Sequence, residues 1–356
     1  MSLNDLRVAL LGCGRISRRH ADLLHSGAIT GARLVGAADI DPEKLDTFTK
    51  RYNVPCFSSI PDLLNHVSPD AVAVLTPSGM HADHVISLAP HVKYLIVEKP
   101  MALSLDDADR MITACDLHGC RLFVVKQNRF NLPVQKARQA LEQGRFGRLV
   151  LGTVRVRWCR QQDYYDQDSW RGTWALDGGV LTNQASHHID LLQWMFGDVD
   201  SVMAMSSTAL VNIETEDTAV VILRFTSGAL GVIEATTATR PKDLEGSISI
   251  LGEHGSVVIG GFAVNQITTW EFTQPRPEDQ DIITNYSVNP PDVYGFGHHE
   301  FYRHVIDCIA TGRQHLVDGL EGRKSLEIIN AIYESVETGR EVFLRFKPKH
   351  VRLGGR

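Results

Sequence analysis

The first third of the chain alternates short apolar runs with stretches of helical spacing. Five runs are apolar throughout and predict buried strands, at residues 6–11, 34–38, 71–75, 94–97 and 122–125. Segments compatible with helices lie between them, at residues 18–25, 42–52, 60–66, 81–88 and 105–117. Strand–helix alternation of this kind is typical of βαβ units. We therefore expect an α/β domain at residues 1–126, built on a doubly wound parallel sheet.

The pattern changes after residue 126. One helix over residues 133–143 precedes longer strands at residues 149–158, 202–206, 218–225, 230–239 and 247–251. Residues 154–158 alternate apolar and charged side chains, as a half-exposed antiparallel strand does. A polar loop over 276–281, helices over 300–310 and 324–338, and a last strand over 342–346 follow. The sequence thus predicts an α+β domain over residues 127–356 with a large, mostly antiparallel, open-faced sheet.

A sheet of this size with helices on one face leaves its other face uncovered. Burial against another subunit is the usual solution, because large exposed apolar faces are rare on monomers. We therefore expect a homo-oligomer.

The bulk composition excludes several classes of protein. The 356 residues suggest about two domains. Lys+Arg 36 against Asp+Glu 42 gives a net charge of -6, which argues against nucleic acid or a membrane surface as the main partner. No apolar run reaches the roughly 18 residues of a membrane span, and the N-terminus has no signal-peptide pattern. The six cysteines are scattered without a C-x-x-C pair, so we expect a reduced, cytoplasmic protein without structural zinc.

A glycine motif follows the first predicted strand and opens the first helix. Gly12 and Gly14 permit a tight turn and a close backbone approach to a pyrophosphate, which then lies at the helix N-terminus. Ser17 stands where a third glycine is common, and it is still small enough for close helix packing. Asp39 ends the second strand, where a carboxylate binds ribose hydroxyls and repels a 2′-phosphate, so NAD is favoured over NADP. Alternatively, Asp39 caps the helix that begins at Pro42, a role for which Asp41 is the other candidate.

Two tripeptides, Thr76-Pro77-Ser78 and Glu98-Lys99-Pro100, follow the predicted strands at residues 71–75 and 94–97. Ligands of open α/β sheets bind outside the carboxyl ends of the strands, which is where both tripeptides lie. A lysine after an apolar strand is often only a solvated strand end. Here Glu98 can hold the ammonium of Lys99 and Pro100 fixes the turn, which favours a functional role for the lysine.

A stretch with many polar residues runs from residue 170 to residue 194, into an apolar helix. On a helix, Asn183, His187 and Asp190 are spaced i, i+4 and i+7 and share one face, whereas His188 lies about 100° away. Three polar residues on one face favour a functional His187 over a structural one. A metal site from His187 and Asp190 lacks evident further ligands, so we expect no metal.

Aromatic and arginine side chains gather before this helix and on the preceding strand: Tyr164, Tyr165, Trp170, Arg171, Trp174, Arg155, Arg157 and Arg160. Aromatic faces together with guanidinium groups suit a sugar ring and a diphosphate. The alternative is an aromatic subunit interface.

Together these motifs resemble the Gfo/Idh/MocA family of NAD(P)-dependent sugar oxidoreductases over essentially the whole chain. The motifs that carry the resemblance are Gly12-Cys13-Gly14-Arg15-Ile16, Asp39-Ile40-Asp41, Thr76-Pro77-Ser78, Glu98-Lys99-Pro100 and the helix from His187 to Asp190. The resemblance implies a Rossmann domain, then a sheet domain whose open face builds dimers and tetramers. It also implies oxidation of a sugar carbinol by NAD, with His187 as base and Lys99 orienting the hydroxyl, although members differ over which takes the proton. Many members carry Asp where this chain has Asn183, which disfavours simple inositol or glucose dehydrogenase activity.

A narrower similarity links the chain to the UDP-N-acetylglucosaminuronate 3-dehydrogenases. It rests on Lys126-Gln127-Asn128-Arg129-Phe130, Tyr164-Tyr165, the run from Trp170 to Trp174, Asp177-Gly178-Gly179 and Asn183-Gln184-Ala185-Ser186-His187. It implies oxidation of the C3 hydroxyl of a UDP-sugar uronate in bacterial O-antigen and lipopolysaccharide synthesis, and in some relatives recycling of NADH with 2-oxoglutarate. The alternatives are a dehydrogenase of a free sugar, inositol or sugar acid, and a non-catalytic NAD- or sugar-sensing regulator.

The motifs and the resemblance together define the expected site. Lys99 and His187 are the expected catalytic residues. The expected NAD-binding residues are Gly12, Gly14, Arg15, Ile16, Asp39, Ile40, Thr76, Pro77, His81, Glu98, Lys99 and Gln127. The expected substrate-binding residues are Lys99, Arg157, Tyr165, Trp170, Arg171, Asn183, Gln184 and His187.

Overall fold

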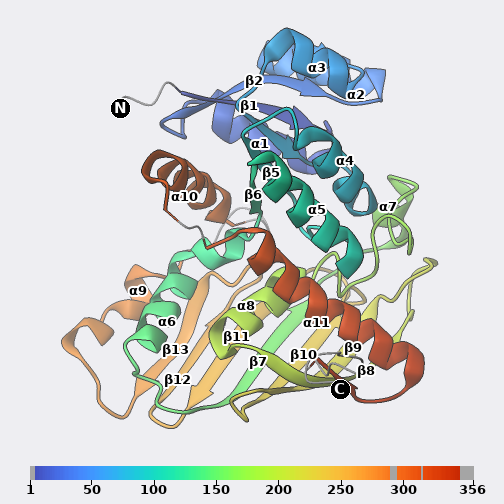
Figure 1. Cartoon of the computed structure of the whole chain (residues 1–356). Helices are drawn as coiled ribbons and strands as arrows, with labels where there is room; N and C mark the ends of the chain where they lie inside the picture. The colour runs from blue at the N-terminus through green and yellow to red at the C-terminus, as the bar shows by residue number, and fades with distance from the viewer. Residues whose placement is uncertain (1–4, 289–294, 314–315, 345–356) are drawn as a thin grey trace, which may run out of the picture.

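The computed structural model describes residues 5–288, 295–313 and 316–344 of the chain. Figure 1 shows a first sheet wrapped by helices above a second, larger sheet that carries helices on one face. Two helices from the last third of the chain, α10 (Gly297–Thr311) and α11 (Gly319–Thr338), lie where the two parts meet.

The first sheet is parallel and holds six strands in the order β3-β2-β1-β4-β5-β6. Its strands are β1 (Leu6–Leu11), β2 (Ala32–Ala38), β3 (Cys56–Phe57), β4 (Ala71–Val74), β5 (Tyr94–Val97) and β6 (Arg121–Val124). The helices between them are α1 (Arg15–His25), α2 (Pro42–Tyr52), α3 (Ile60–Val67), α4 (His81–Leu88) and α5 (Leu105–His118). The predicted doubly wound sheet is confirmed, and only the two-residue β3 was not predicted. The strand order reverses between β1 and β4, which opens a crevice at the carboxyl edge of the sheet.

The second sheet holds eight strands in the order β13-β12-β11-β7-β10-β9-β8-β14. They are β7 (Leu149–Arg157), β8 (Val199–Ser207), β9 (Thr218–Phe225), β10 (Leu230–Thr236), β11 (Glu245–Gly252), β12 (Gly255–Gly260), β13 (Gln266–Phe272) and β14 (Val342–Phe343). Only β7 and β10 pair in parallel, so the prediction of a mostly antiparallel sheet is confirmed. Strands β12 and β13 were not predicted, and residues 345–346 of the predicted last strand lie outside the described residues.

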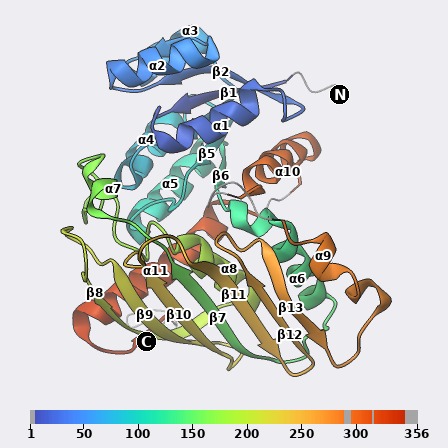
Figure 2. The same cartoon turned by 180° about the vertical axis from the view of Figure 1, so that it is seen from behind.

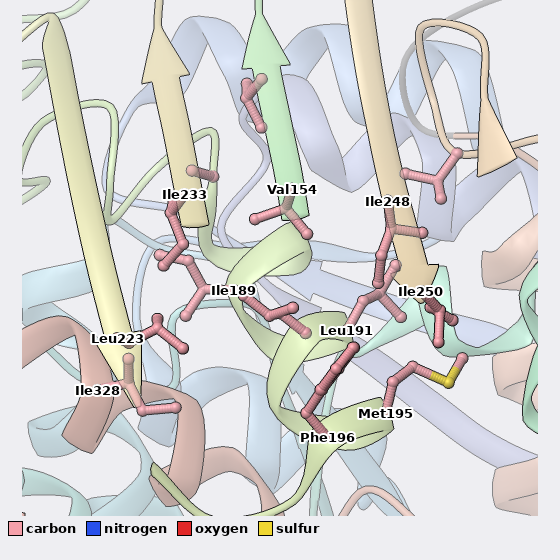
Figure 3. Close-up of a cluster of buried hydrophobic side chains, with 14 of the residues drawn as sticks. Val154, Ile189, Leu191, Met195, Phe196, Leu223, Ile233, Ile248, Ile250 and Ile328 are labelled. Atoms are coloured by element: carbon pink, nitrogen blue, oxygen red, sulfur yellow. The ribbon is translucent and has the colours of Figure 1, made fainter. Parts of the chain in front are cut away.

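The remaining helices of this part are α6 (Leu132–Glu142), α7 (Gln162–Asp166), α8 (Ser186–Phe196) and α9 (Ile282–Asn285). Helix α8 packs on the inner face of the second sheet. Figure 3 shows its Ile189 and Leu191 among strand side chains such as Val154. A Cβ at Gly152 would lie 2.5 Å from the Phe196 ring, so glycine at this point of β7 lets the helix approach the sheet closely. This packing fixes the first turn of α8, where His187 lies.

The opposite face of the second sheet is uncovered. In Figure 2, which is seen from behind, its strands lie in front of α8 and α11. Apolar side chains are exposed on neighbouring strands of this face: Met203, Met205, Val220, Ile222 and Leu230. The homo-oligomer remains a prediction, and this face is where it would form. In the described part of the chain, no helix has both the length and the apolar character of a membrane span.

Helix α10 belongs to the core of the first sheet, although it comes late in the chain. Its Phe301 and Tyr302 are buried in the same cluster as Leu10 of β1. The main-chain N–H of Val124 donates to the carbonyl of Val317 at 2.7 Å, which ties β6 to the segment between α10 and α11. The predicted division at 126/127 therefore separates segments of sequence that pack together, and it remains a prediction.

Candidate active site

A cavity of about 1030 Å³ opens at the carboxyl edge of the first sheet. One wall comes from the turns after β1, β2, β4 and β5, and the other from α7, the segment that follows it and the first turn of α8. Every residue expected to bind NAD lines this cavity: Gly12, Gly14, Arg15, Ile16, Asp39, Ile40, Thr76, Pro77, His81, Glu98, Lys99 and Gln127. Five expected substrate-binding residues line it as well: Lys99, Trp170, Arg171, Asn183 and His187.

Main-chain groups form the end of the cavity nearest α1. Gly12 has a φ of 101°, and a Cβ there would lie 2.9 Å from the carbonyl of Leu75, so the turn requires glycine. Gly14 is the N-cap of α1, and no described side chain caps this helix. The first N–H groups of α1 are therefore free to bind an anion, which the helix dipole also favours.

Asp39 is held in the cavity wall by the main chain. Its carboxylate accepts hydrogen bonds from the N–H of Cys13 at 2.6 Å and from the N–H of Asp41 at 2.9 Å. Asp41 caps α2 by accepting hydrogen bonds from two amides of the first turn, at 2.9 and 3.3 Å. The alternative role of Asp39 as the helix cap is therefore wrong, and its carboxylate faces the cavity rather than the helix.

His81 joins the turn after β4 to the turn after β5. Its Nε2 lies 2.8 Å from the carbonyl oxygen of Thr76, and its Nδ1 lies 2.9 Å from that of Pro100. Burial lowers the pKa of His81, so the ring is neutral at pH 7 and donates to one of the two carbonyls. The two tripeptides that the sequence singled out are thus held next to each other.

Glu98 lies in a buried cluster with two histidines. Its Oε1 is 3.0 Å from Nε2 of His20 and 3.6 Å from Nε2 of His298, and its Oε2 accepts a hydrogen bond from the N–H of Lys99 at 3.0 Å. Burial raises the pKa of Glu98, but the hydrogen bonds from the two histidines bring it well below its usual range. The ligand-type atoms of His20, Glu98 and His298 lie within 4.8 Å of one another, and these hydrogen bonds account for the grouping. The prediction that Glu98 holds the Lys99 ammonium is therefore wrong, since it holds the main chain of that residue.

The ammonium of Lys99 donates instead to the main-chain oxygen of Asn183, at 2.5 Å. Burial lowers the pKa of Lys99, while the charges of Glu98 and Asp177 oppose this effect. The side-chain amide of Asn183 donates to the carboxylate of Asp177. The turn that binds the Lys99 ammonium is thus itself held by the buried carboxylate of Asp177, through the side chain of Asn183.

His187 lies in the first turn of α8 and is buried beside Gln127. The amide nitrogen of Gln127 lies 2.8 Å from Nε2 of His187. Burial, followed by the positive charge of Lys99, lowers the pKa of His187 well below its usual value. The ring is therefore neutral at pH 7. Its Nε2 accepts a hydrogen bond from the Gln127 amide, so it can take a proton only when that hydrogen bond is broken or the amide turns over.

Asp190 lies in an ion cluster below His187 and does not line the cavity. It accepts from Arg129 Nε at 2.7 Å and lies 3.0 Å from the ammonium of Lys126, with all three groups buried. The cluster fixes α8 to the segment that carries Gln127. The predicted common helix face of Asn183, His187 and Asp190 is wrong, because the helix begins at residue 186, after Asn183.

An aromatic wall formed by Tyr164, Trp170 and Arg171 faces the turns of the first sheet. Arg171 donates to Asp168 at 3.1 Å and to the hydroxyl of Tyr164 at 3.0 Å. Its guanidinium carbon lies 4.5 Å from the centre of the Trp170 ring. The wall therefore offers a fixed cation beside an aromatic surface.

Three expected substrate-binding residues lie outside the cavity. Arg157 is on the uncovered face of the second sheet, where it donates to Glu234 at 2.6 Å. The hydroxyl of Tyr165 lies 3.1 Å from that of Thr237, and Tyr165 lines a neighbouring cavity of about 320 Å³. Gln184 is buried in the turn before α8 without reaching the cavity lining. Arg157 is separated from the site because alternate residues of β7 face opposite sides of the sheet.

The sequence left open whether the segment with His298 lines the sugar pocket or lies at a subunit interface, and it gave Asp177 no role of its own; His298 lines the cavity. His298 comes from the start of α10 and carries no local motif that connects it with Glu98. Asp177 had a usable signal, because an acid directly before a glycine pair is typical of a structured turn.

Two models of the Gfo/Idh/MocA family match the chain. The model described as "Oxidoreductase family, NAD-binding Rossmann fold" matches residues 6–126, and the one described as "Oxidoreductase family, C-terminal alpha/beta domain" matches residues 138–344. A curated relative, the myo-inositol 2-dehydrogenase of Thermotoga maritima, is 28% identical over 348 residues, which are 95% of this chain and 98% of that protein.

Two solved structures are more similar in sequence. The WlbA dehydrogenase from Bordetella pertussis, in complex with NADH and UDP-GlcNAcA, is 43% identical with a TM-score of 0.88, covering 97% of this chain and 100% of that chain. The WlbA dehydrogenase from Chromobacterium violaceum, also in complex with NADH and UDP-GlcNAcA, is 42% identical with a TM-score of 0.90, covering 98% of each chain.

Proposed function

The chain belongs to the Gfo/Idh/MocA oxidoreductase family, and we propose that it oxidises the C3 hydroxyl of a UDP-N-acetylglucosaminuronate to the 3-keto sugar with NAD. The observation that carries this proposal is one cavity in which the glycine motif meets Lys99, His187 and the aromatic wall. Its volume of about 1030 Å³ lies just above the usual range for small-molecule sites, about 300–1,000 Å³, which suits a cofactor and a nucleotide sugar together. The likeness to two dehydrogenases solved with NADH and UDP-GlcNAcA supports the same substrate.

The protein is an NAD-dependent sugar dehydrogenase, and the α1 end of the cavity suits this cofactor. The uncapped N-terminus of α1 and the open turn at Gly12 would hold the diphosphate. Asp39 would accept hydrogen bonds from the ribose hydroxyls. When bound, NAD supplies the acceptor for the hydride that leaves the sugar carbon.

His187 would take the hydroxyl proton, because its ring is neutral at pH 7 and lies in the cavity wall. The hydroxyl proton would pass to the imidazole of His187, and the electron pair of the O–H bond would complete the carbonyl as the bound NAD accepted the hydride from C3. The products would be NADH, the 3-keto sugar and one proton.

Lys99 would orient the hydroxyl and stabilise the negative charge that develops on its oxygen. The ammonium is held on the main-chain oxygen of Asn183, which leaves its other protons available to the substrate. A fixed cation in a partly buried site needs little reorganisation during the reaction, which is the usual source of electrostatic stabilisation.

The aromatic wall would bind the anionic part of the substrate. A UDP-uronate carries a diphosphate and a carboxylate, and both suit a guanidinium group. Arg171 is the arginine of this wall, whereas Arg157 and Arg160 lie outside the cavity and the other arginines that line it, Arg15 and Arg18, belong to α1. Asp168 holds the Arg171 guanidinium beside Trp170, so recognition of the anion at this wall would depend on Arg171.

Incubating the NAD-loaded protein with UDP-GlcNAcA, and separately with myo-inositol, tests the proposal through the absorbance of NADH. We expect turnover of the nucleotide sugar alone. Turnover of myo-inositol alone would indicate a free-sugar dehydrogenase, and binding of both ligands without any NADH would indicate a sensing protein. Adding 2-oxoglutarate and detecting 2-hydroxyglutarate by mass spectrometry would test whether it reoxidises NADH, as the narrower resemblance implies.

The same proposal includes assembly as a dimer of dimers and a cytoplasmic role in O-antigen synthesis. The uncovered sheet face supports the assembly, since Met205, Val220 and Ile222 are exposed side by side on paired strands. Light scattering would measure the mass, and Ile222→Glu should reduce it by placing a charge in the interface. A monomeric mass for the unmodified protein would contradict the proposed assembly.

A further inference from the structure

Asp177 is a buried carboxylate that connects the two parts of the site involved in catalysis. Its side chain is almost fully buried, and its Oδ2 accepts a hydrogen bond from the N–H of Gly172 at 2.8 Å. Its Oδ1 accepts the side-chain amide of Asn183, whose main-chain oxygen binds the Lys99 ammonium. Gly172 directly follows Arg171 of the aromatic wall. One carboxylate therefore ties the wall to the turn that receives Lys99.

We propose that Asp177 is a positioning residue for Lys99. Through Asn183 it fixes the carbonyl that receives the ammonium, and its charge compensates that ammonium inside the protein. The proposal rests on the role of Lys99 proposed above, and it assigns the compensating charge to a residue that does not line the cavity.

The charges around Lys99 explain why this acid matters. The titratable groups that act on Lys99 or are affected by it are Glu98, Asp177, Arg171, Lys126 and His187. Burial lowers the pKa of Lys99, Glu98 and Asp177 raise it, and Arg171 and Lys126 lower it. Glu98 is committed to the histidine cluster and to the main chain. Asp177 is therefore the acid whose charge can be removed without disturbing that cluster.

Variants at Asp177 can change its charge while keeping the hydrogen bonds that its side chain makes. In Asp177→Asn, the new amide oxygen can accept from Gly172, and the new amide nitrogen can donate to the Asn183 side chain once that amide turns over. The exchanged double variant, Asp177→Asn with Asn183→Asp, keeps the same number of hydrogen bonds and returns one negative charge to the pair. If Asp177 acted only through its hydrogen bonds and not through its charge, the single and the double variant would behave alike.

The first measurement needs no sugar substrate. Cyanate carbamylates neutral amines, so the rate of modification at Lys99 against pH, followed by peptide mass spectrometry, reports the titration of that residue. We expect the midpoint to fall by about one pH unit in Asp177→Asn and to return toward the original value in the double variant. Asp163→Asn, an acid-to-amide change on the exposed side of α7, is the matched control and should leave the midpoint in place.

The second measurement is the pH profile of kcat/KM with the nucleotide sugar. We expect the alkaline limb, on which Lys99 loses its proton, to move to lower pH in Asp177→Asn while the affinity for NAD is retained. A lower rate at every pH with both midpoints unmoved would overturn the proposal and leave Asp177 as a structural residue. If Asp177→Asn does not fold, the exchanged double variant decides instead: its one carboxylate belongs to residue 183, whose carbonyl binds the ammonium, so the Lys99 midpoint must stay at or above the wild-type value, and a fall would overturn the proposal. If the wild-type protein oxidises no UDP-sugar, the proposed function fails, and the cyanate titration still decides the role of Asp177.

Discussion

The two ends of the cavity are built from different groups. At the α1 end, the ligand faces free main-chain N–H groups and a carboxylate, Asp39, that two main-chain amides hold in place. At the opposite end, the ligand faces ionisable side chains: Lys99, His187 and Arg171, with Asp177 behind them. Main-chain dipoles do not titrate and survive most substitutions, whereas a buried ionisable group changes with pH and is lost with one substitution. We therefore expect NAD binding to be robust and sugar oxidation to be sensitive.

The strongest test of this difference is the removal of the proposed base. His187→Ala should lower kcat by about a hundredfold to ten-thousandfold, the usual contribution of a general base, with little change in the dissociation constant of NAD. Stopped-flow formation of NADH and titration of NAD by fluorescence measure the two quantities separately. Full activity of the variant would remove His187 from the mechanism.

The buried ion cluster under the sugar end should contribute more to stability than any surface pair. Asp190→Ala removes the acid shared by Lys126 and Arg129, leaving Lys126 buried without an acid and Arg129 paired with Glu321 alone, and the free energy of unfolding should fall by about 3–5 kcal/mol. Glu142→Ala removes an exposed pair with Arg138 and is the matched control, with an expected loss of about 0–1 kcal/mol. Urea denaturation of both variants gives the comparison, and equal losses would contradict it.

A buried histidine next to the base should make the sugar end sensitive to acid. His188 is fully buried against Trp158, and burial lowers its pKa to about 3. Because the folded pKa lies below the unfolded one, the unfolded chain binds the proton first, and stability present above about pH 6.5 is lost as the pH falls. The loss between pH 7 and pH 5 should be about 2 kcal/mol for this group. His188→Leu should lose that much less over the same interval in urea titrations, and parallel curves for the two proteins would exclude His188 as the source.

The smallest effect should come from the main-chain end. Asp39→Asn keeps one acceptor oxygen for the amides that hold it but removes the charge, so NAD binding should weaken by about 1.4 kcal/mol, or roughly tenfold. Binding of NADP should improve, because the charge that repels a 2′-phosphate is gone. Kinetics with both cofactors measure the preference. Equal turnover of NAD and NADP by the unmodified protein would show that Asp39 does not set it.

Local sequence signals predicted the α1 end because its parts are neighbours along one βαβ unit. Gly12 and Gly14 lie between a strand and a helix, and Asp39 ends the next strand, so their meeting follows from the fold class alone. Helix α2 and strand β5 were predicted to the residue, since Pro42 marks a helix start and β5 is apolar throughout. Strands β12 and β13 were missed because glycine, serine and threonine interrupt their apolar positions.

The sugar end depends on contacts that no local pattern encodes. Asn183 would be helical only if α8 began before it. The N-cap residue, Ala185, has no side chain that can cap a helix, so the sequence carries no signal for the start of α8, and the helix was predicted to begin too early. The alternation in β7 correctly predicted two faces, but it cannot show that the outer face holds acids for Arg157. His298 reaches Glu98 from a helix almost two hundred residues later, a contact that depends on tertiary structure.

The position of α10 late in the sequence also affects when the first sheet can fold during synthesis. The first sheet is complete in sequence at β6, yet Phe301, Tyr302 and Val317 supply part of its core and its last edge contact. On the ribosome, strands β1 to β6 must therefore wait, with an incomplete core and with Glu98 lacking His298, until nearly the whole chain has emerged. Residues 149–272 form most of the second sheet from one continuous stretch, but its core is completed by Ile328, Ile329 and Ile332 of α11. Both sheets are therefore completed only by helices from the end of the chain.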